Sequence, residues 1–164
     1  MSNYEKFYKK ISAPWRRHPA GIRALNRINA LLTATVYAAY PAFLVRLIWN
    51  RDERWVKAAA VPAVFFILLS VLRKWINRPR PYETWNLCPL IQKDTSGKSM
   101  PSRHVFSCAV IAMAFLSVSL PAGIFFLIWS CVLALVRVLG GVHYPSDVLA
   151  GLLIGILAGV LIFV

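Results

Sequence analysis

Two histidines and one aspartate are the residues of this sequence best suited to covalent chemistry. His143 lies four residues before Asp147, and His104 lies in a separate segment. An aspartate at this spacing can fix the tautomer of the imidazole and stabilise its protonated form. One histidine can then act as a nucleophile while the other transfers a proton. Two-step phosphoryl transfer requires this pair of roles.

Arginines accompany these residues at the ends of apolar segments. Arg73 and Arg80 follow one such segment. Arg103 precedes another, and Arg137 ends a third. A planar guanidinium binds phosphate oxygens through two donors. Pro101 suits the first turn of a helix, whose free N–H groups attract an anion. The sequence therefore indicates a site for a phosphate group.

Five apolar stretches must position these residues. They span residues 30–49, 56–72, 104–120, 122–139 and 147–164, close to the length of about 20 residues that crosses a bilayer. If the stretches alternate across a membrane, all the segments that carry the ionisable residues meet at one face. Ionisable residues at that depth are costly and mark functional sites. We expect an all-α, multi-pass membrane helical bundle with five transmembrane helices.

The last stretch carries a stripe of small residues. Gly151, Gly155 and Gly159 recur every four residues. Such a stripe lets a neighbouring helix approach closely. The alternative is that these glycines are merely tolerated on a lipid-facing helix.

The same polar cluster allows two other interpretations. His104, His143 and Asp147 are residues that can bind zinc, but the neighbouring arginines would repel a dication. The arginines could also extend only to the headgroup layer, with the histidines forming ordinary hydrogen bonds. The convergence of four separate segments argues against this second interpretation. We expect no metal and no other cofactor.

Residues 1–29 differ from the rest of the chain. Apolar side chains at helical spacing occupy one face of this segment: Tyr4, Phe7, Tyr8 and Ile11. Lysines occupy the other face, which favours an interfacial amphipathic helix on an anionic lipid surface. The alternative is a basic anchor that only sets topology. We therefore divide the chain into this basic interfacial segment and a transmembrane catalytic domain at 30–164.

The composition excludes several classes of protein. Of the 164 residues, 59% are hydrophobic and only 15% are charged, whereas a soluble domain carries about 25% charged residues. The chain is too apolar to be disordered. Its net charge is +13, and the basic residues lie between long apolar runs rather than on the face of a soluble domain. This pattern favours anionic membrane partners over nucleic acid.

Three short motifs follow one another along the chain. They read RKWINRPRP at residues 73–81, PSRH at 101–104 and VRVLGGVHYPSD at 136–147. They resemble the K-x6-RP, PSGH and SR-x5-H-x3-D motifs of the type 2 phosphatidic acid phosphatase (PAP2) family. The resemblance covers about residues 56–164. The combined spacing is specific, although each motif alone would be weak.

The resemblance implies roles for individual residues. His143 would be the nucleophile that forms a phosphohistidine, Asp147 would orient and activate it, and His104 would protonate the leaving group. The residues that would hold the phosphate are Arg80, Ser102 and Arg137. No metal is implied. The six helices of the family core would be the five spans plus the N-terminal segment.

The sequence departs from the family motifs at three positions. Arg73 stands where the family has lysine, and we expect Lys74 beside it to compensate. Arg103 stands where the family has glycine. It could contact the second phosphate of a diphosphate or point to the headgroup layer. Val136 replaces the serine before Arg137, which removes one minor phosphate contact.

The function expected is metal-independent hydrolysis of a membrane lipid phosphate or diphosphate. Arg103 favours a polyprenyl (undecaprenyl) diphosphate. Phosphatidylglycerol phosphate and phosphatidic acid are the alternatives within this class. A non-enzymatic basic lipid-binding membrane protein is the alternative of another class. Such a protein would need the arginines but neither His104 nor the spacing of His143 and Asp147.

The distribution of basic residues predicts which membrane face holds the site. They are frequent in segment 1–29 and in the connection at the site end, which carries Arg73, Lys74, Arg78, Arg80, Lys93, Lys98 and Arg103. The opposite end carries Arg46, Arg51, Arg54 and Lys57. The positive-inside rule then places the site at the cytoplasmic face of the cell membrane. Several PAP2 relatives that recycle carrier lipids work on the outer face instead, so the two indications disagree. We therefore predict a cytoplasmic site from the distribution of basic residues.

Overall fold

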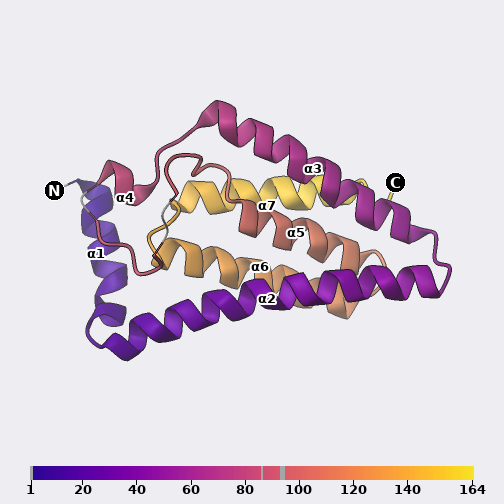
Figure 1. Cartoon of the computed structure of the whole chain (residues 1–164), viewed down its shortest axis with the longest axis horizontal. Coiled ribbons are helices and arrows are strands. Elements are labelled where there is room, and N and C mark those ends of the chain that lie inside the picture. The colour runs from indigo at the N-terminus through magenta and orange to yellow at the C-terminus, as the bar shows by residue number, and fades with distance from the viewer. Residues whose placement is uncertain (1, 86, 93–94) are drawn as a thin grey trace.

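The computed structural model describes residues 2–85, 87–92 and 95–164, and these form a bundle of α-helices (Figure 1). No strand occurs among these residues, which confirms the all-α prediction. Lys93 lies outside the described residues. The helices are α1 (Asn3–Arg16), α2 (Pro19–Trp49), α3 (Arg54–Ile76), α4 (Pro81–Thr84), α5 (Arg103–Leu116), α6 (Leu120–Leu139) and α7 (Pro145–Val160).

Helix α5 is the centre of the bundle. It packs against α6 and α7, and α2 and α3 form a long hairpin whose arms diverge toward the end where α4 lies (Figure 1). Nine of the side chains of α5 are buried, from Val105 to Ala114. An apolar helix that is buried almost all round is typical of a bundle core.

The glycine stripe of α7 faces α5. A Cβ atom built on Gly155 would lie 2.7 Å from the Cβ of Ala109, and one built on Gly159 would lie 2.3 Å from the Cβ of Met113. Only a hydrogen atom fits at these positions. The close approach expected from the sequence is therefore confirmed, and it brings the start of α7 against the start of α5.

Five of the helices fall on the five expected stretches. Three helical segments, Pro19–Trp49, Arg54–Thr84 and Leu120–Leu139, are long and apolar enough to cross a membrane. Helices α5 and α7 have 14 and 16 residues and are shorter than a typical span. Apolar side chains such as Leu31, Ile67 and Leu135 are exposed on the outside of the bundle, as lipid contact requires. The number of five transmembrane helices stays a prediction.

The segment 1–29 contains helix α1 and the start of α2, and the division of the chain at residue 30 stays a prediction. Helix α2 begins at Pro19, so residues 19–29 continue the first span. The apolar spacing continues there, and Leu25 is fully buried. Helix α1 lies across the site end of the bundle (Figure 1), as expected for a helix in the interface. A capping box between Ser2 and Glu5 fixes its first turn.

The connection between α3 and α5 folds back over this same end. The backbone N–H groups of Leu90 and Ile91 donate to the carbonyl oxygen of Gly140, at 3.0 and 3.2 Å. The N–H of Ser99 donates to the carbonyl oxygen of Arg78 at 2.9 Å. The connection is therefore tied to the turn after α6, which leads to His143.

Candidate active site

The structure gathers the predicted residues at one end of the bundle. A cavity of about 380 Å³ opens between the end of α3, the connection, the start of α5 and the turn before α7. The side chains and segment that line it are Arg73, Arg80, Arg103, His104, His143 and residues 95–98. Residues from motifs that are far apart in the sequence thus share one cavity.

His143 and Asp147 form a buried pair beside this cavity. The Nδ1 atom of His143 lies 3.6 Å from Oδ2 of Asp147, and the two side chains are 1% and 0% exposed. Burial lowers the pKa of His143 to about 3, although the nearby Asp147 carboxylate opposes this shift. The imidazole is therefore neutral at physiological pH, which is the form that can attack phosphorus.

A turn that contains Gly141 precedes His143. Gly141 has a φ of +74°, a conformation that favours glycine. A Cβ atom at this position would lie 2.4 Å from the hydroxyl oxygen of Tyr8 in α1. Helix α1 thus packs directly on the turn that precedes His143.

Backbone carbonyls hold two of the arginines. Arg73 donates to the carbonyl oxygens of Lys98 and Pro101. Arg80 donates to Gly97 at 3.1 Å and to Val142 at 3.0 Å. Carbonyl groups fix the direction of a guanidinium without neutralising its charge. The cavity therefore presents several guanidinium groups to an anion.

Arg137 and Ser102 carry unused polar atoms. Nη1 of Arg137 donates to Oδ1 of Asn29 at 3.2 Å, but its Nε and Nη2 atoms are buried without a hydrogen-bond partner. The hydroxyl of Ser102 is also buried without a partner. Buried polar groups are rarely left unpaired. Neither residue is among those that line the cavity of about 380 Å³, so their part in binding a phosphate stays a prediction.

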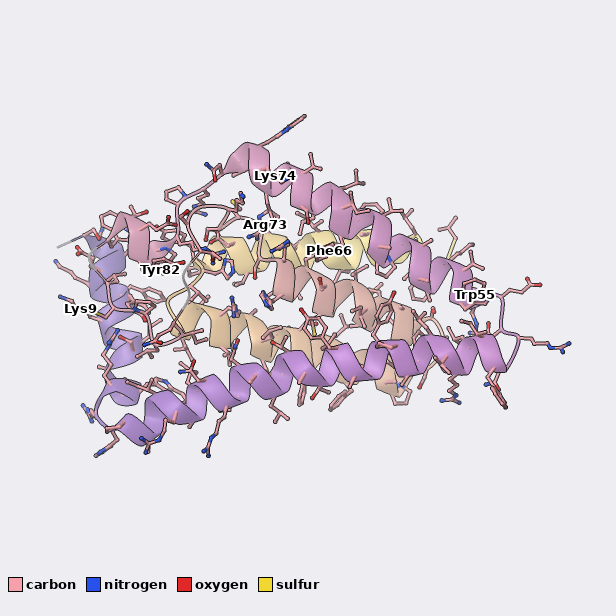
Figure 2. The ribbon with its side chains drawn as sticks, in the orientation of Figure 1. Lys9, Trp55, Phe66, Arg73, Lys74 and Tyr82 are labelled. Atoms are coloured by element: carbon pink, nitrogen blue, oxygen red, sulfur yellow. The ribbon has the colours of Figure 1, made fainter. Side chains whose placement is uncertain are left out.

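Lys74 does not join the site, contrary to the expectation that it compensates for Arg73. Its side chain is exposed, whereas Arg73 is buried and faces the bundle (Figure 2). Consecutive residues on an α-helix differ in direction by about 100°, so Arg73 and Lys74 cannot both face the cavity. Arg73, without Lys74, therefore provides the positive charge at the first position of the first motif.

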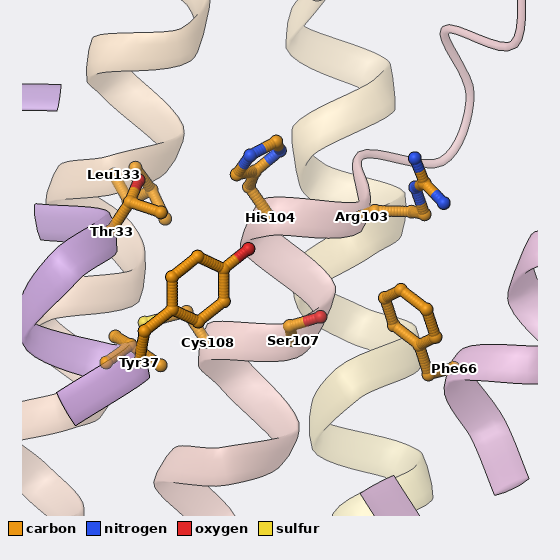
Figure 3. Close-up of a pocket in the computed structure, with 9 residues that line it drawn as sticks. Thr33, Tyr37, Phe66, Arg103, His104, Ser107, Cys108 and Leu133 are labelled. Carbon is orange, nitrogen blue, oxygen red and sulfur yellow. The ribbon is translucent and has the colours of Figure 1, made fainter. Parts of the chain in front are cut away.

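Arg103 and His104 lie between two cavities. Both line the cavity of about 380 Å³, which we call the arginine cavity, and a second cavity of about 250 Å³. Figure 3 shows them together at the start of α5, with Tyr37 and Phe66 on the facing sides of α2 and α3. The guanidinium of Arg103 lies 5.6 Å from the centre of the Phe66 ring. The second cavity is mostly apolar, with Val36, Phe66, Cys108 and Leu133 among its lining residues.

Sequence reasoning missed two residues that contact Asp147. Nη1 of Arg78 lies 2.8 Å from Oδ1 of Asp147, and the hydroxyl of Ser99 donates to Oδ2. Arg78 lies inside the first motif, and this position is the sequence feature that could have indicated a role for it. Ser99 lies two residues before the second motif and carries no signal of its own.

Comparison with known proteins identifies the family. Residues 54–164 match the family model of the PAP2 superfamily. The chain belongs to the PAP2 superfamily. This confirms the resemblance seen in the three motifs and makes the protein a PAP2-type membrane phosphatase.

Two curated relatives are similar in sequence. Undecaprenyl-diphosphatase BcrC from Bacillus subtilis is 26% identical over 144 residues, covering 85% of this chain and 74% of the relative. Lipid A 1-phosphatase from Rhizobium etli is 31% identical over 108 residues, covering 62% of this chain and 46% of the relative. The chain therefore spans less than half the length of the second relative.

Two solved structures share the fold. LpxE from Aquifex aeolicus superposes with a TM-score of 0.76 and 23% identity, covering 96% of this chain and 93% of that one. The transmembrane PAP2-type phosphatidylglycerolphosphate phosphatase from Bacillus subtilis gives a TM-score of 0.74 and 22% identity, covering 99% of this chain and 86% of that one. Both superpositions extend well beyond the matched family region at residues 54–164.

Proposed function

We propose that this PAP2 phosphatase hydrolyses a membrane lipid phosphate or diphosphate through a phosphohistidine at His143, without a metal ion. The observation that carries the proposal is the buried pair of His143 and Asp147 at a cavity where the guanidinium groups of Arg73 and Arg80 donate to backbone carbonyls. Such a cavity offers a nucleophile and an anion-binding field in one place.

The first step forms the phosphoenzyme. Nε2 of His143 attacks phosphorus while the bond from phosphorus to the leaving oxygen breaks. The imidazole becomes positively charged, and Asp147 stabilises it by accepting a hydrogen bond from Nδ1–H. His104 gives its proton to the leaving oxygen, so the lipid product departs in protonated form.

The second step returns the enzyme to its starting state. His104, now neutral, takes a proton from a water molecule as that water attacks the phosphohistidine. The bond between Nε2 and phosphorus breaks, inorganic phosphate leaves, and His143 is neutral again. Throughout both steps Arg73, Arg80 and Arg137 would stabilise the charge on the phosphoryl oxygens.

A polyprenyl diphosphate, such as undecaprenyl diphosphate, is the substrate we favour. Arg103 lines both the arginine cavity and the second cavity, where it could bind a second phosphate while a lipid chain contacts the apolar side chains of the second cavity. The similarity to an undecaprenyl-diphosphatase supports this choice. The structural likeness to a phosphatidylglycerolphosphate phosphatase keeps that substrate as the alternative, together with phosphatidic acid.

The direct test is release of inorganic phosphate by the purified protein in the presence of EDTA. The substrates are farnesyl diphosphate, phosphatidylglycerol phosphate and phosphatidic acid. We expect EDTA-resistant turnover, fastest with the diphosphate. Absence of phosphate release from every substrate would favour a non-enzymatic lipid-binding protein, and loss of activity in EDTA would contradict the metal-free mechanism.

Replacing Arg103 with glycine tests the diphosphate assignment. If Arg103 binds a second phosphate, R103G should lower kcat/KM for the diphosphate about tenfold or more relative to a monophosphate, because one charge-assisted hydrogen bond is lost. The measurement is the ratio of the two kcat/KM values, with R51G at the far end of the bundle as the control. An unchanged ratio would remove the reason for preferring a diphosphate.

We also propose that α1 rests on an anionic lipid surface. Lys6 and Lys10 are exposed on it, Arg17 is exposed directly after it, and Phe7 is 41% exposed beside the two lysines. Exposed lysines around an apolar ring are typical of an interfacial helix. A spin label at position 7 should be relaxed more by oxygen, which dissolves in lipid, than by a water-soluble nickel complex. The reverse ranking would exclude membrane contact at Phe7.

The charge distribution further leads us to propose a cytoplasmic site. Cys88 is exposed in the connection at the site end, Cys108 is buried, and Cys131 lies within the apolar helix α6. A membrane-impermeant thiol reagent should therefore miss Cys88 in intact spheroplasts and label it in inverted vesicles. Labelling of spheroplasts that is lost in C88S would reverse the topology and favour a carrier-recycling role at the outer face.

A further inference from the structure

Three donors from separate segments surround the carboxylate of Asp147. Arg78 approaches Oδ1 with Nη1 at 2.8 Å. The hydroxyl of Ser99 and the backbone N–H of Tyr144 both donate to Oδ2, the latter at 2.9 Å. Both oxygens of a fully buried carboxylate therefore have partners besides His143.

Arg78 and Ser99 are themselves held in place. The guanidinium of Arg78 lies 4.2 Å from the centre of the Tyr144 ring and donates to the hydroxyl of Ser146 at 2.8 Å. The side chain of Ser99 is fully buried, and its N–H donates to the carbonyl oxygen of Arg78. The two donors thus form one unit that joins both ends of the connection to the start of α7.

Neither Arg78 nor Ser99 lines the arginine cavity. Their polar contacts are with Asp147, with residues beside it and, for Ser99, with Nδ1 of His143. Resting on the proposed phosphohistidine mechanism, we infer that Ser99 and Arg78 are positioning residues, which orient Asp147 so that Oδ2 faces Nδ1 of His143.

The geometry explains why such positioning is needed. Nδ1 of His143 is 3.6 Å from Oδ2 of Asp147 and 3.4 Å from the hydroxyl oxygen of Ser99. The gap to the carboxylate is longer than a normal hydrogen bond and must close as the imidazole gains charge. A carboxylate that is fixed on both oxygens can meet Nδ1–H in one orientation, whereas a loosened one rotates among its remaining donors.

The first experiment replaces Ser99 with alanine. We expect S99A to lower kcat by about tenfold to a hundredfold, the effect of losing one hydrogen bond to a charged group. Inhibition by inorganic phosphate should be unchanged, because Ser99 does not line the cavity that binds it. The matched control is S130A, since Ser130 is equally buried but donates to the carbonyl oxygen of Phe126 within α6.

The second experiment uses Arg78, whose side chain is partly exposed and whose replacement disturbs packing less. We expect R78Q to lower kcat about tenfold and R78K to retain more activity, because lysine keeps a cation for Oδ1. Weaker phosphate inhibition in R78Q would make Arg78 a phosphate-binding residue and overturn the inference for it.

The outcomes separate this inference from the proposed function. A kcat for S99A within twofold of that of S130A would overturn the positioning role of Ser99. An equal loss of kcat and of phosphate inhibition in S99A would instead indicate collapse of the site. If the wild-type protein releases no phosphate from farnesyl diphosphate, phosphatidylglycerol phosphate or phosphatidic acid, the proposed function fails, and the inference fails with it.

Discussion

Replacing His143 with alanine is expected to reduce turnover by about a thousandfold or more, because the covalent step then has no nucleophile. The neutral, buried imidazole is the only group that the structure places both at the arginine cavity and against Asp147 among the described residues. The measurement is phosphate release by purified H143A, with the thermal unfolding midpoint recorded to confirm folding.

The control for this variant is H18A, since His18 is exposed at the start of α2. It should keep wild-type activity. Retention of more than about a hundredth of the activity by folded H143A would show that another group attacks phosphorus.

Replacing His104 with glutamine is expected to have the second-largest effect, and its size should depend on the leaving group. Loss of a general acid costs about a hundredfold to ten-thousandfold. An alcohol leaving from a lipid monophosphate needs a proton, whereas a phosphate leaving from a diphosphate is already a stable anion. The loss should therefore be larger for phosphatidic acid than for farnesyl diphosphate.

The measurement is kcat for both substrates with H104Q, the wild-type protein and H18Q as the matched control. An equal loss for the two substrates would contradict the role of His104 as the acid for the leaving group. It would favour a role for His104 in binding the phosphate, which its place on the cavity wall also allows.

The meeting of the three motifs could be predicted from the sequence because a membrane restricts how helices are arranged. Apolar stretches that alternate across a bilayer put Arg73, His104 and His143 at the same end whatever the details of packing. The close approach of α7 to α5 could also be predicted from the glycine stripe, since only the absence of a side chain permits it.

Other features depend on contacts that no periodic pattern records. The inward direction of Arg73 and the outward direction of Lys74 follow from the rotation of α3, which packing decides. Ser99 reaches Asp147 through an irregular connection, where neither helical nor strand periodicity applies. The position of α1 was predicted only as interfacial, and its packing through Tyr8 onto Gly141 required the structure.

The most direct test of the account is to trap the phosphoenzyme. Purified protein mixed with substrate labelled with ³²P at the transferred phosphoryl group and quenched in alkali should carry label that is stable to base and lost in acid, as expected for a phosphorus–nitrogen bond. Peptide mapping should place it on His143, and H143A should carry none. Label on another residue, or rapid turnover in which no labelled protein forms at any time, would contradict a phosphohistidine at this site.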